Sequence, residues 1–363
     1  MSLIKVKGRG AENLGRRNIV INGAMQVVQR GTVSSLTGSS YGGPDRFRLG
    51  LSGAGTHRIL QSATVPSGSG FANSWRLDCT TADTSITSSD QISCQYRIEG
   101  QDVQQLKKGT SSAEKVTLSF WVRSSLTGTY VLELMDEDNT RHIAKTYTIS
   151  QADTFEHKIL TFDGDTTGVL DDDNARSLQI QWWLAAGPTY TTGTLPTSWA
   201  SRVDANRAVG HNVNLASSTD NNWYLTGVQL EVGDTATDFE HRSFGEELLL
   251  CKRYFEKSYD VGTAPGTNSD YNSTENWTVN GDGSGNAIIS PSFKVEKRGA
   301  ATMVAYRATG ETGSWNYYRN GATSTGGVTF DRIGTNTTRC YTAIGSNWAS
   351  ASIFGHWTAD AEL

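Results

Sequence analysis

Short segments in which apolar and polar residues alternate recur between residues 57 and 232. In the last of them, Val228 and Leu230 lie on one side, whereas Gln229 and Glu231 lie on the other. An alternation of period two is typical of a β-strand that is buried on one face. We expect strands at residues 57–62, 74–79, 92–98, 116–123, 130–135, 146–149, 156–162, 178–184 and 223–232. Because no long helical period interrupts them, they predict an all-β fold, a jelly-roll-like antiparallel β-sandwich.

The pattern changes after residue 232. A polar turn leads to residues 246–257, where acidic residues precede basic ones among helix formers, and this predicts a short helix. Alternating segments then resume at 286–295, 302–307, 314–319, 328–333, 339–344 and 351–358. We therefore predict an N-terminal arm at 1–17, the sandwich at 18–245, a connecting helix at 246–258 and a second, smaller β domain at 259–363.

Several segments between the regular strands have a character of their own. Residues 18–30 alternate and predict a first strand, whereas 32–55 and 261–285 are rich in Gly, Ser and Thr and predict a surface loop and a linker. Residues 187–211 form a long loop, which is either functional or disordered. The arm at 1–17 is basic and aperiodic, and it either docks onto a neighbouring component or is disordered.

The net charge and the cysteine content limit the kinds of partner, metal site and disulfide that we expect. The formal net charge is −5 and there is no basic block, so we expect no nucleic-acid partner. The 4 cysteines form no CxxC pair, and they predict buried thiols rather than a zinc site or a disulfide scaffold. We also expect no signal peptide, because residues 1–18 lack an apolar core. We expect no membrane span, because no apolar run approaches about 20 residues.

Three stretches resemble the tail fibre and appendage proteins of tailed bacteriophages, which attach to the host. They read NIVINGAMQVVQRG, VTLSFWVRSSLTGTY and GVQLEVGDTATDFEHRSFGEELLLCKRYFE. The resemblance implies a carbohydrate-binding-module-like sandwich in a non-enzymatic virion component, synthesised in the host cytoplasm. It further implies a homotrimer that contacts other tail or fibre proteins and the host surface polysaccharide or lipopolysaccharide.

Polar and aromatic residues at the positions facing away from the predicted core are the candidate contacts. An indole ring can receive the apolar face of a sugar, and planar amide or guanidinium groups can bind its hydroxyls. The same mixture suits a subunit or inter-domain interface, or simple exposure to solvent. The candidates for glycan binding or an interface are Arg97, Trp121, Arg123, Gln179, Gln181, Trp183, Gln229 and Glu231.

The second domain offers another aromatic set among Gly-, Asn- and Ser-rich loops. Tyr and Trp in such surroundings make adaptable contact surfaces, although a small domain also needs large residues for its core. If residues 1–17 attach to the virion, this domain is the host-facing tip. The candidates for the tip are Trp315, Tyr317, Tyr318 and Trp348.

Catalytic and metal motifs are weak or missing in the sequence. Patterns for a nucleophile elbow, HExxH zinc binding and phosphate loops do not occur. A glycosidase needs two carboxylates that are not close in sequence, so a surface-polysaccharide depolymerase stays an alternative, as does a capsid decoration protein without a receptor. Asp163, Asp165 and Asp171 follow a calcium loop in part, with Thr167 and Asn174 departing from the pattern, and the competing interpretation is an Asp-Gly turn. We expect no other cofactor.

Overall fold

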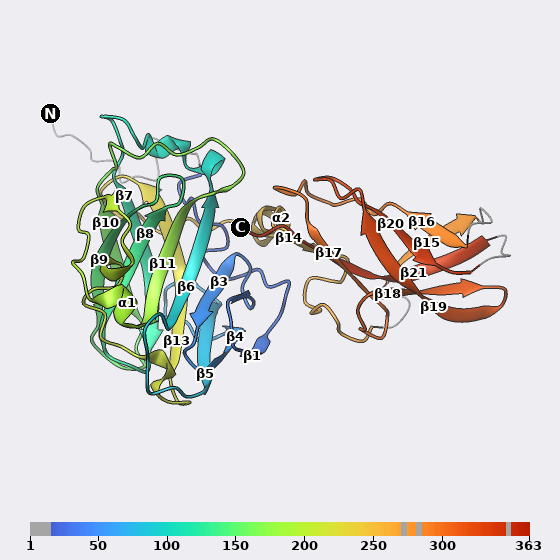
Figure 1. Cartoon of the computed structure of the whole chain (residues 1–363), viewed down its shortest axis with the longest axis horizontal. Coiled ribbons are helices and arrows are strands. Elements are labelled where there is room, and N and C mark those ends of the chain that lie inside the picture. The colour runs from blue at the N-terminus through green and yellow to red at the C-terminus, as the bar shows by residue number, and fades with distance from the viewer. Residues whose placement is uncertain (1–15, 270–273, 281–284, 346–349) are drawn as a thin grey trace.

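The computed structural model describes residues 16–269, 274–280, 285–345 and 350–363. Most of the predicted N-terminal arm lies outside these residues. The first part of the chain forms two antiparallel sheets that face each other (Figure 1). In order, the six-stranded sheet contains β1 (Val33–Leu36), β4 (Thr56–Ser62), β5 (Ser74–Thr81), β13 (Asn222–Val232), β7 (Val116–Ser124) and β10 (Glu156–Phe162).

The seven-stranded sheet covers the other side of the same core. In order, it contains β12 (Ala200–Ser201), β9 (Arg141–Ile149), β8 (Gly128–Asp136), β11 (Arg176–Ala186), β6 (Gln91–Glu99), β3 (Phe47–Ser52) and β2 (Ser40–Tyr41). Alternate residues of the strands point inward, and the rings of Phe120 and Trp182 meet across the core with centroids 5.7 Å apart. The predicted all-β sandwich is confirmed, and every strand expected between residues 57 and 232 is present.

Two predictions for the first 55 residues are wrong. Residues 18–30 form no strand, because Asn22 and Met25 take positive φ values of 60° and 58°. The Asn22 side chain satisfies the backbone instead, since its amide donates to the Val27 carbonyl and accepts from the Val27 N–H, both at 2.9 Å. The expected loop at 32–55 contains β1, β2 and β3. The first two are short edge strands with partly exposed residues, so their alternation is weak.

The connecting helix α2 (Phe244–Lys252) is shorter than predicted. It begins at a capping box, in which Ser243 accepts from the Glu246 N–H and the Glu246 carboxylate accepts from the Ser243 N–H. It ends early because the following residues form β14 (Phe255–Lys257), which pairs with the last strand of the chain. The buried side of the helix, with Cys251, packs against Ile21.

The C-terminal part of the chain forms an eight-stranded arrangement around its last strand, β21 (Ser350–Asp360). The predicted linker at 261–285 contains one of these strands. The hydrophobic core of this part of the chain includes Trp315, Ile353 and Trp357. The remaining strands are β14, β15 (Glu275–Asn280), β16 (Asn286–Ile289), β17 (Thr302–Tyr306), β18 (Ser314–Arg319), β19 (Ala322–Asp331) and β20 (Arg339–Ala343).

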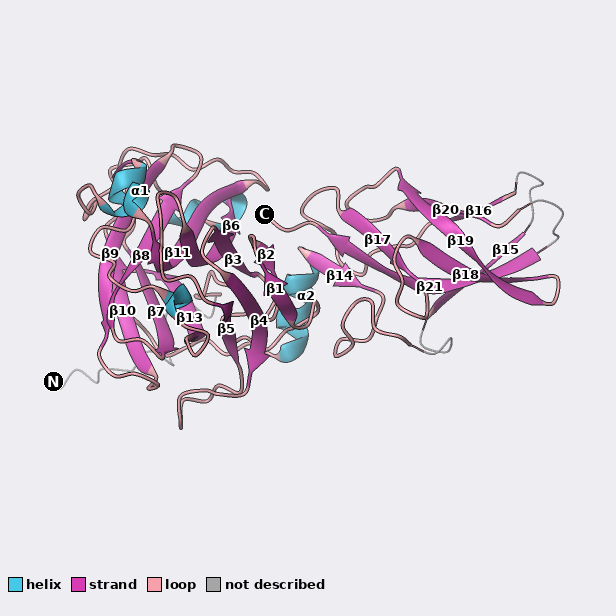
Figure 2. Cartoon of the chain, turned by 60° about the horizontal axis from the view of Figure 1, so that its bottom comes forward, coloured by secondary structure: helices cyan, strands magenta, loops and turns pink. Residues whose placement is uncertain are grey.

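Buried and half-buried ion pairs join the sandwich to the segments that follow it. Arg46, in the turn before β3, forms an ion pair with Glu362, and its guanidinium lies 3.3 Å from the centroid of the Tyr254 ring. Arg253, which follows α2, donates two hydrogen bonds of 2.9 and 2.7 Å to Glu99 of β6. Figure 2 shows α2 between the sandwich and the C-terminal strands.

Two further sequence predictions can be compared with the described residues. All 4 cysteines lie within them, and each is an unpaired, buried thiol, as predicted. None of the helices in the described ranges is long and apolar enough to cross a membrane.

Candidate functional site

The predicted glycan or interface residues lie on two opposite faces of the sandwich. Strands β7 and β13 belong to the six-stranded sheet, and β6 and β11 belong to the seven-stranded sheet. The predicted set therefore cannot form a single site. Trp121, Arg123, Gln229 and Glu231 lie on the outer side of the first sheet, and Arg97, Gln179, Gln181 and Trp183 lie on the outer side of the second.

An open pocket lies on the outer face of the six-stranded sheet, at Trp121. Strand pairing places His157 of β10 opposite Trp121 of β7, and their rings stack with centroids 4.9 Å apart. The rings of Phe71, Phe239 and His241 form a second group, with centroids 4.9 to 5.4 Å apart. The pocket has a volume of about 340 Å³. This aromatic pocket is lined by Ser69, Phe71, Ser119, Trp121, His157, Gly227, Thr237, Asp238, Phe239 and His241.

The backbone of β13 leaves room for these rings at Gly227. The pairing of β13 with β7 shifts register between Thr226 and Gln229, and Gly227 there has a φ of +61°. A Cβ atom at this position would lie 2.7 Å from the Phe71 ring and 3.0 Å from the Trp121 ring. Glycine is therefore required both by the backbone conformation and by the close approach of the two rings.

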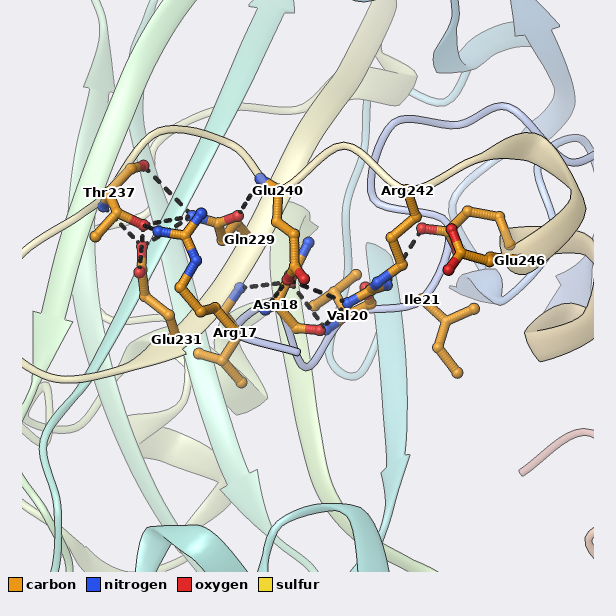
Figure 3. Close-up of polar contacts among 12 residues, drawn as sticks. Arg17, Asn18, Val20, Ile21, Gln229, Glu231, Thr237, Glu240, Arg242 and Glu246 are labelled. Atoms are coloured by element: carbon orange, nitrogen blue, oxygen red, sulfur yellow. Dashed lines mark hydrogen bonds and ion pairs between the residues drawn. The ribbon is translucent and has the colours of Figure 1, made fainter. Parts of the chain in front are cut away.

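Gln229 and Glu231 hold the loop that forms one wall of the pocket (Figure 3). Glu231 accepts hydrogen bonds from the Thr237 N–H at 2.9 Å and from its hydroxyl at 2.7 Å. The Gln229 amide oxygen accepts from the Glu240 N–H at 2.8 Å. Both side chains are buried, so they position the wall and do not form the outward-facing contact that the sequence pattern predicts.

Residues near the start of the described chain brace the same loop from outside. Arg17 donates a 2.9 Å hydrogen bond to the Thr237 hydroxyl, and Glu240 accepts one of 2.6 Å from the Asn18 N–H. Arg242 donates to the backbone carbonyls of Asn18 and Val20 (Figure 3). The irregular segment that replaces the predicted first strand therefore fixes the loop beside the pocket.

The pocket combines aromatic faces with small polar groups. Within the described lining, Asp238 is the one carboxylate and there is no Lys or Arg. Burial lowers the pKa of His157, which favours the neutral ring with one donor and one acceptor nitrogen at neutral pH. Such a site can stack an apolar ring face and exchange hydrogen bonds with hydroxyl groups. Arg123 is outside the lining, because it pairs with Asp153 at 2.8 Å.

Trp183 points away from the core, as predicted, but it is 0% exposed. The loop predicted at 187–211, which contains α1 (Pro188–Thr191), covers it with Tyr190 at a ring centroid distance of 5.0 Å. Its indole N–H donates to Glu133 at 3.1 Å, and Glu133 also pairs with His142 at 2.8 Å. Trp183 therefore stabilises the loop and is not available to a ligand.

The tip candidates differ in their exposure. Trp315 is fully buried and Tyr317 is buried, so both belong to the core of the C-terminal strands. Tyr318 is 49% exposed and can contact a partner. Trp348 lies outside the described residues.

The calcium candidates do not come together as a cation site. Asp165 is buried and accepts hydrogen bonds from Lys108 at 3.0 Å and Arg141 at 2.7 Å. Burial raises the pKa of Asp165, but the hydrogen bonds, first that from Arg141, lower it to about 2 overall. Asp163 is exposed and pairs with Lys115, and Asp171 is exposed. Among the described residues, no group of three or more His, Cys, Asp or Glu side chains could hold a metal ion.

The aromatic pocket was only partly predictable from sequence. Trp121 is the one predicted residue in its lining. Phe71, His157, Phe239 and His241 were missed, because they come from separate loops and strands and share no motif. The alternation of β10 could have suggested His157 as an outward-facing residue.

No protein-family model and no curated protein matches this sequence. Solved structures with similar chains include the enzymatically active domain of tailspike protein 4 from bacteriophage CBA120, at 12% identity and a TM-score of 0.28, covering 59% of this chain. The match spans 21% of that tailspike chain. A family 11 carbohydrate-binding module from Clostridium thermocellum matches at 10% identity and a TM-score of 0.29, covering 57% of this chain and 99% of the module. A putative sugar-binding protein from Bacteroides thetaiotaomicron matches at 12% identity and a TM-score of 0.31, covering 60% of this chain and 100% of that one.

Proposed function

We propose that this chain is a non-enzymatic appendage protein of a tailed bacteriophage that attaches the virion to its host by binding a neutral glycan in the aromatic pocket. The observation that carries the glycan proposal is the open pocket with Trp121 stacked on His157. Its volume of about 340 Å³ falls within the range of roughly 300–1,000 Å³ usual for ligand sites. The three sequence stretches that resemble phage fibre proteins support the virion assignment.

The chemistry of the lining favours a neutral sugar over an acidic one. Indole and phenyl faces accept the apolar side of a pyranose ring, and neutral His157 can bind its hydroxyls. Asp238, the carboxylate of the described lining, would repel an acidic sugar. Assembly as a homotrimer alongside other tail or fibre proteins would place several copies of the pocket on one virion. Several weak contacts made at once would raise the overall affinity for the host surface.

The lining also favours binding over hydrolysis. Glycoside hydrolysis ordinarily uses two carboxyl groups roughly 5–10 Å apart across the bond. In the described lining Asp238 has no second carboxylate beside it. Neighbouring Glu231 is buried and bound to the Thr237 hydroxyl, where it positions the loop. A depolymerase activity would have to lie elsewhere in the protein.

Replacing Trp121 with alanine tests the glycan proposal. We expect Trp121→Ala to weaken binding to immobilised host envelope polysaccharide at least about tenfold, equivalent to about 1.4 kcal/mol. The loss follows from removal of the stacking surface, and binding is measured by surface plasmon resonance. The matched control is Tyr318→Ala, which removes an exposed aromatic ring from the C-terminal strands and is expected to leave binding within about twofold.

Three results would count against this function. Equal binding of Trp121→Ala and the wild-type protein to the immobilised polysaccharide would exclude the aromatic pocket as the glycan site. Release of reducing ends during incubation with the polysaccharide would favour the depolymerase, whereas adsorption to no host surface would favour a capsid decoration protein.

A further inference from the structure

The outer face of the seven-stranded sheet carries a second polar cluster, on the opposite side of the sandwich from the aromatic pocket. Neighbouring strands β3, β6 and β11 supply it, and Figure 1 shows these strands side by side. We call it the arginine–glutamine face. Its members are Arg48, Gln95, Arg97, Arg176, Gln179 and Gln181.

The amide oxygens of this face are already occupied by donors from the face itself. Gln95 Oε1 accepts from Arg48 Nη1 at 2.6 Å, and Gln179 Oε1 accepts from Arg97 Nε at 3.0 Å and from Arg176 Nη1 at 3.1 Å. The groups left for a ligand are therefore N–H donors. This is the pattern of a site that binds an acceptor.

Gln181 lies at the buried centre of the network. Its Oε1 accepts from Gln179 Nε2 at 3.0 Å and from Gln95 Nε2 at 3.3 Å. Its own Nε2 is buried and has no hydrogen-bond partner among the residues that the structure describes. A buried donor without a partner is destabilising, and it adds no negative charge and no free acceptor to the face.

The positive charge of the face is only partly compensated. Arg176 pairs with Glu137 at 3.2 Å. In the described ranges neither Arg48 nor Arg97 has an aspartate or glutamate within ion-pair distance, although both are half-buried. Burial, and next the charge of Arg97, lower the pKa of Arg48 to about 10, so that it is still a cation at neutral pH.

One oxygen from outside the sandwich already lies at the edge of this face. Arg97 Nη1 donates to a terminal oxygen of Leu363, the last residue of the sequence, and the Tyr41 hydroxyl donates to the same oxygen at 3.0 Å. Two donors from different strands thus converge on one acceptor. Among the described residues, Arg48 donates only within the face, to Gln95.

We propose that the arginine–glutamine face binds an oxyanion of an acidic glycan, either a sugar carboxylate or a sugar phosphate. Guanidinium groups match the planar or tetrahedral geometry of these anions and can bind them through two hydrogen bonds. The site does not rest on the neutral-glycan function of the aromatic pocket. It lies on the other sheet and has the opposite charge preference, so that each site can be tested while the other is intact.

The absence of a side chain at Gly50 leaves room for the Gln95 amide. This residue lies opposite Ser93 in the pairing of β3 with β6, and a Cβ atom there would be 2.3 Å from Gln95 Nε2. A valine at this position would displace the Gln95 amide without changing any charge. Gly50→Val therefore tests whether binding depends on the geometry of the face when its charge is unchanged.

Calorimetric titration of the full chain with trigalacturonate and with inorganic phosphate, at low ionic strength, tests the proposal. We expect saturable binding of at least one probe, and the stronger one identifies the carboxylate or the phosphate as the preferred anion. Arg48→Gln is expected to weaken that binding at least tenfold. The matched control Arg123→Gln removes a half-buried arginine from the opposite sheet and is expected to leave it within twofold.

Further variants keep the result interpretable. Arg176→Gln changes a more accessible side chain, so it provides the test if Arg48→Gln does not fold, and we expect at least threefold weaker binding. Gly50→Val is expected to weaken binding by a similar factor, and Trp121→Ala is expected to leave it unchanged. No saturable binding of either probe, or an equal loss in Arg123→Gln, would overturn the proposal.

Discussion

Arg46→Met is expected to lower the free energy of unfolding by about 3–5 kcal/mol, because it leaves a buried carboxylate without its main cation. The Arg46 side chain is 1% exposed and that of Glu362 is 4% exposed. The substitution also removes the cation–π contact with Tyr254 and the 2.7 Å hydrogen bond to the Arg97 carbonyl. Arg30, which lies 3.3 Å from Glu362, limits the loss. Urea denaturation followed by circular dichroism measures it.

A double-mutant cycle separates the ion pair from simple packing. Adding Glu362→Gln to Arg46→Met is expected to restore most of the lost stability, because the second substitution removes the unpaired charge. The control Arg307→Met breaks the more exposed pair with Glu311, which solvent screens, and should cost much less than Arg46→Met. If Arg46→Met costs no more than this control, the buried pair does not couple the last residues to the sandwich.

Trp183→Ala is the second large effect, with an expected loss of about 3–5 kcal/mol from the cavity it creates. The substitution removes a fully buried indole and the N–H donor to Glu133, and it leaves Tyr190 without the ring beneath it. Thermal and urea unfolding measure the loss. Trp121→Ala, from the half-buried pocket wall, is the control and is expected to lose less than half as much. Equal losses would contradict the different burial of the two indoles.

These two tryptophans show how far the alternation pattern can predict a site. Period two correctly places Trp121 and Trp183 on the sides of their strands that face away from the core. It does not say in which sheet each strand lies, or what covers its outer face. The loop over Trp183 and the open pocket at Trp121 depend on contacts between distant segments, and strand periodicity contains no information on these.

The same limit explains Gln229 and Glu231. Their positions in β13 correctly predict polar residues on the outer side of the sheet. Their role depends on Thr237 and Glu240, which fold back from the following turn to bind them. The irregular segment at 18–30 is a similar case, since Asn22 replaces ladder hydrogen bonds with side-chain ones.

Helix α2, in contrast, has a signal that could have set its start. Ser243 and Glu246 stand three residues apart, which is the spacing of a capping box. Its end was harder to predict, because Tyr254 and Phe255 suit a helix face as well as a strand. Pairing of β14 with β21, which is distant in sequence, decides between them.

Fluorine NMR of protein labelled with 5-fluorotryptophan is the most direct measurement of the proposed glycan site. The Trp121 resonance is assigned from Trp121→Phe, and the labelled protein is titrated with oligosaccharides released from the envelope of a bacterium to which it adsorbs. We predict that the Trp121 resonance shifts in a saturable way, while the resonances of buried Trp182 and Trp183 do not. Saturable binding that leaves the Trp121 resonance unmoved would contradict the assignment of the aromatic pocket as the glycan site.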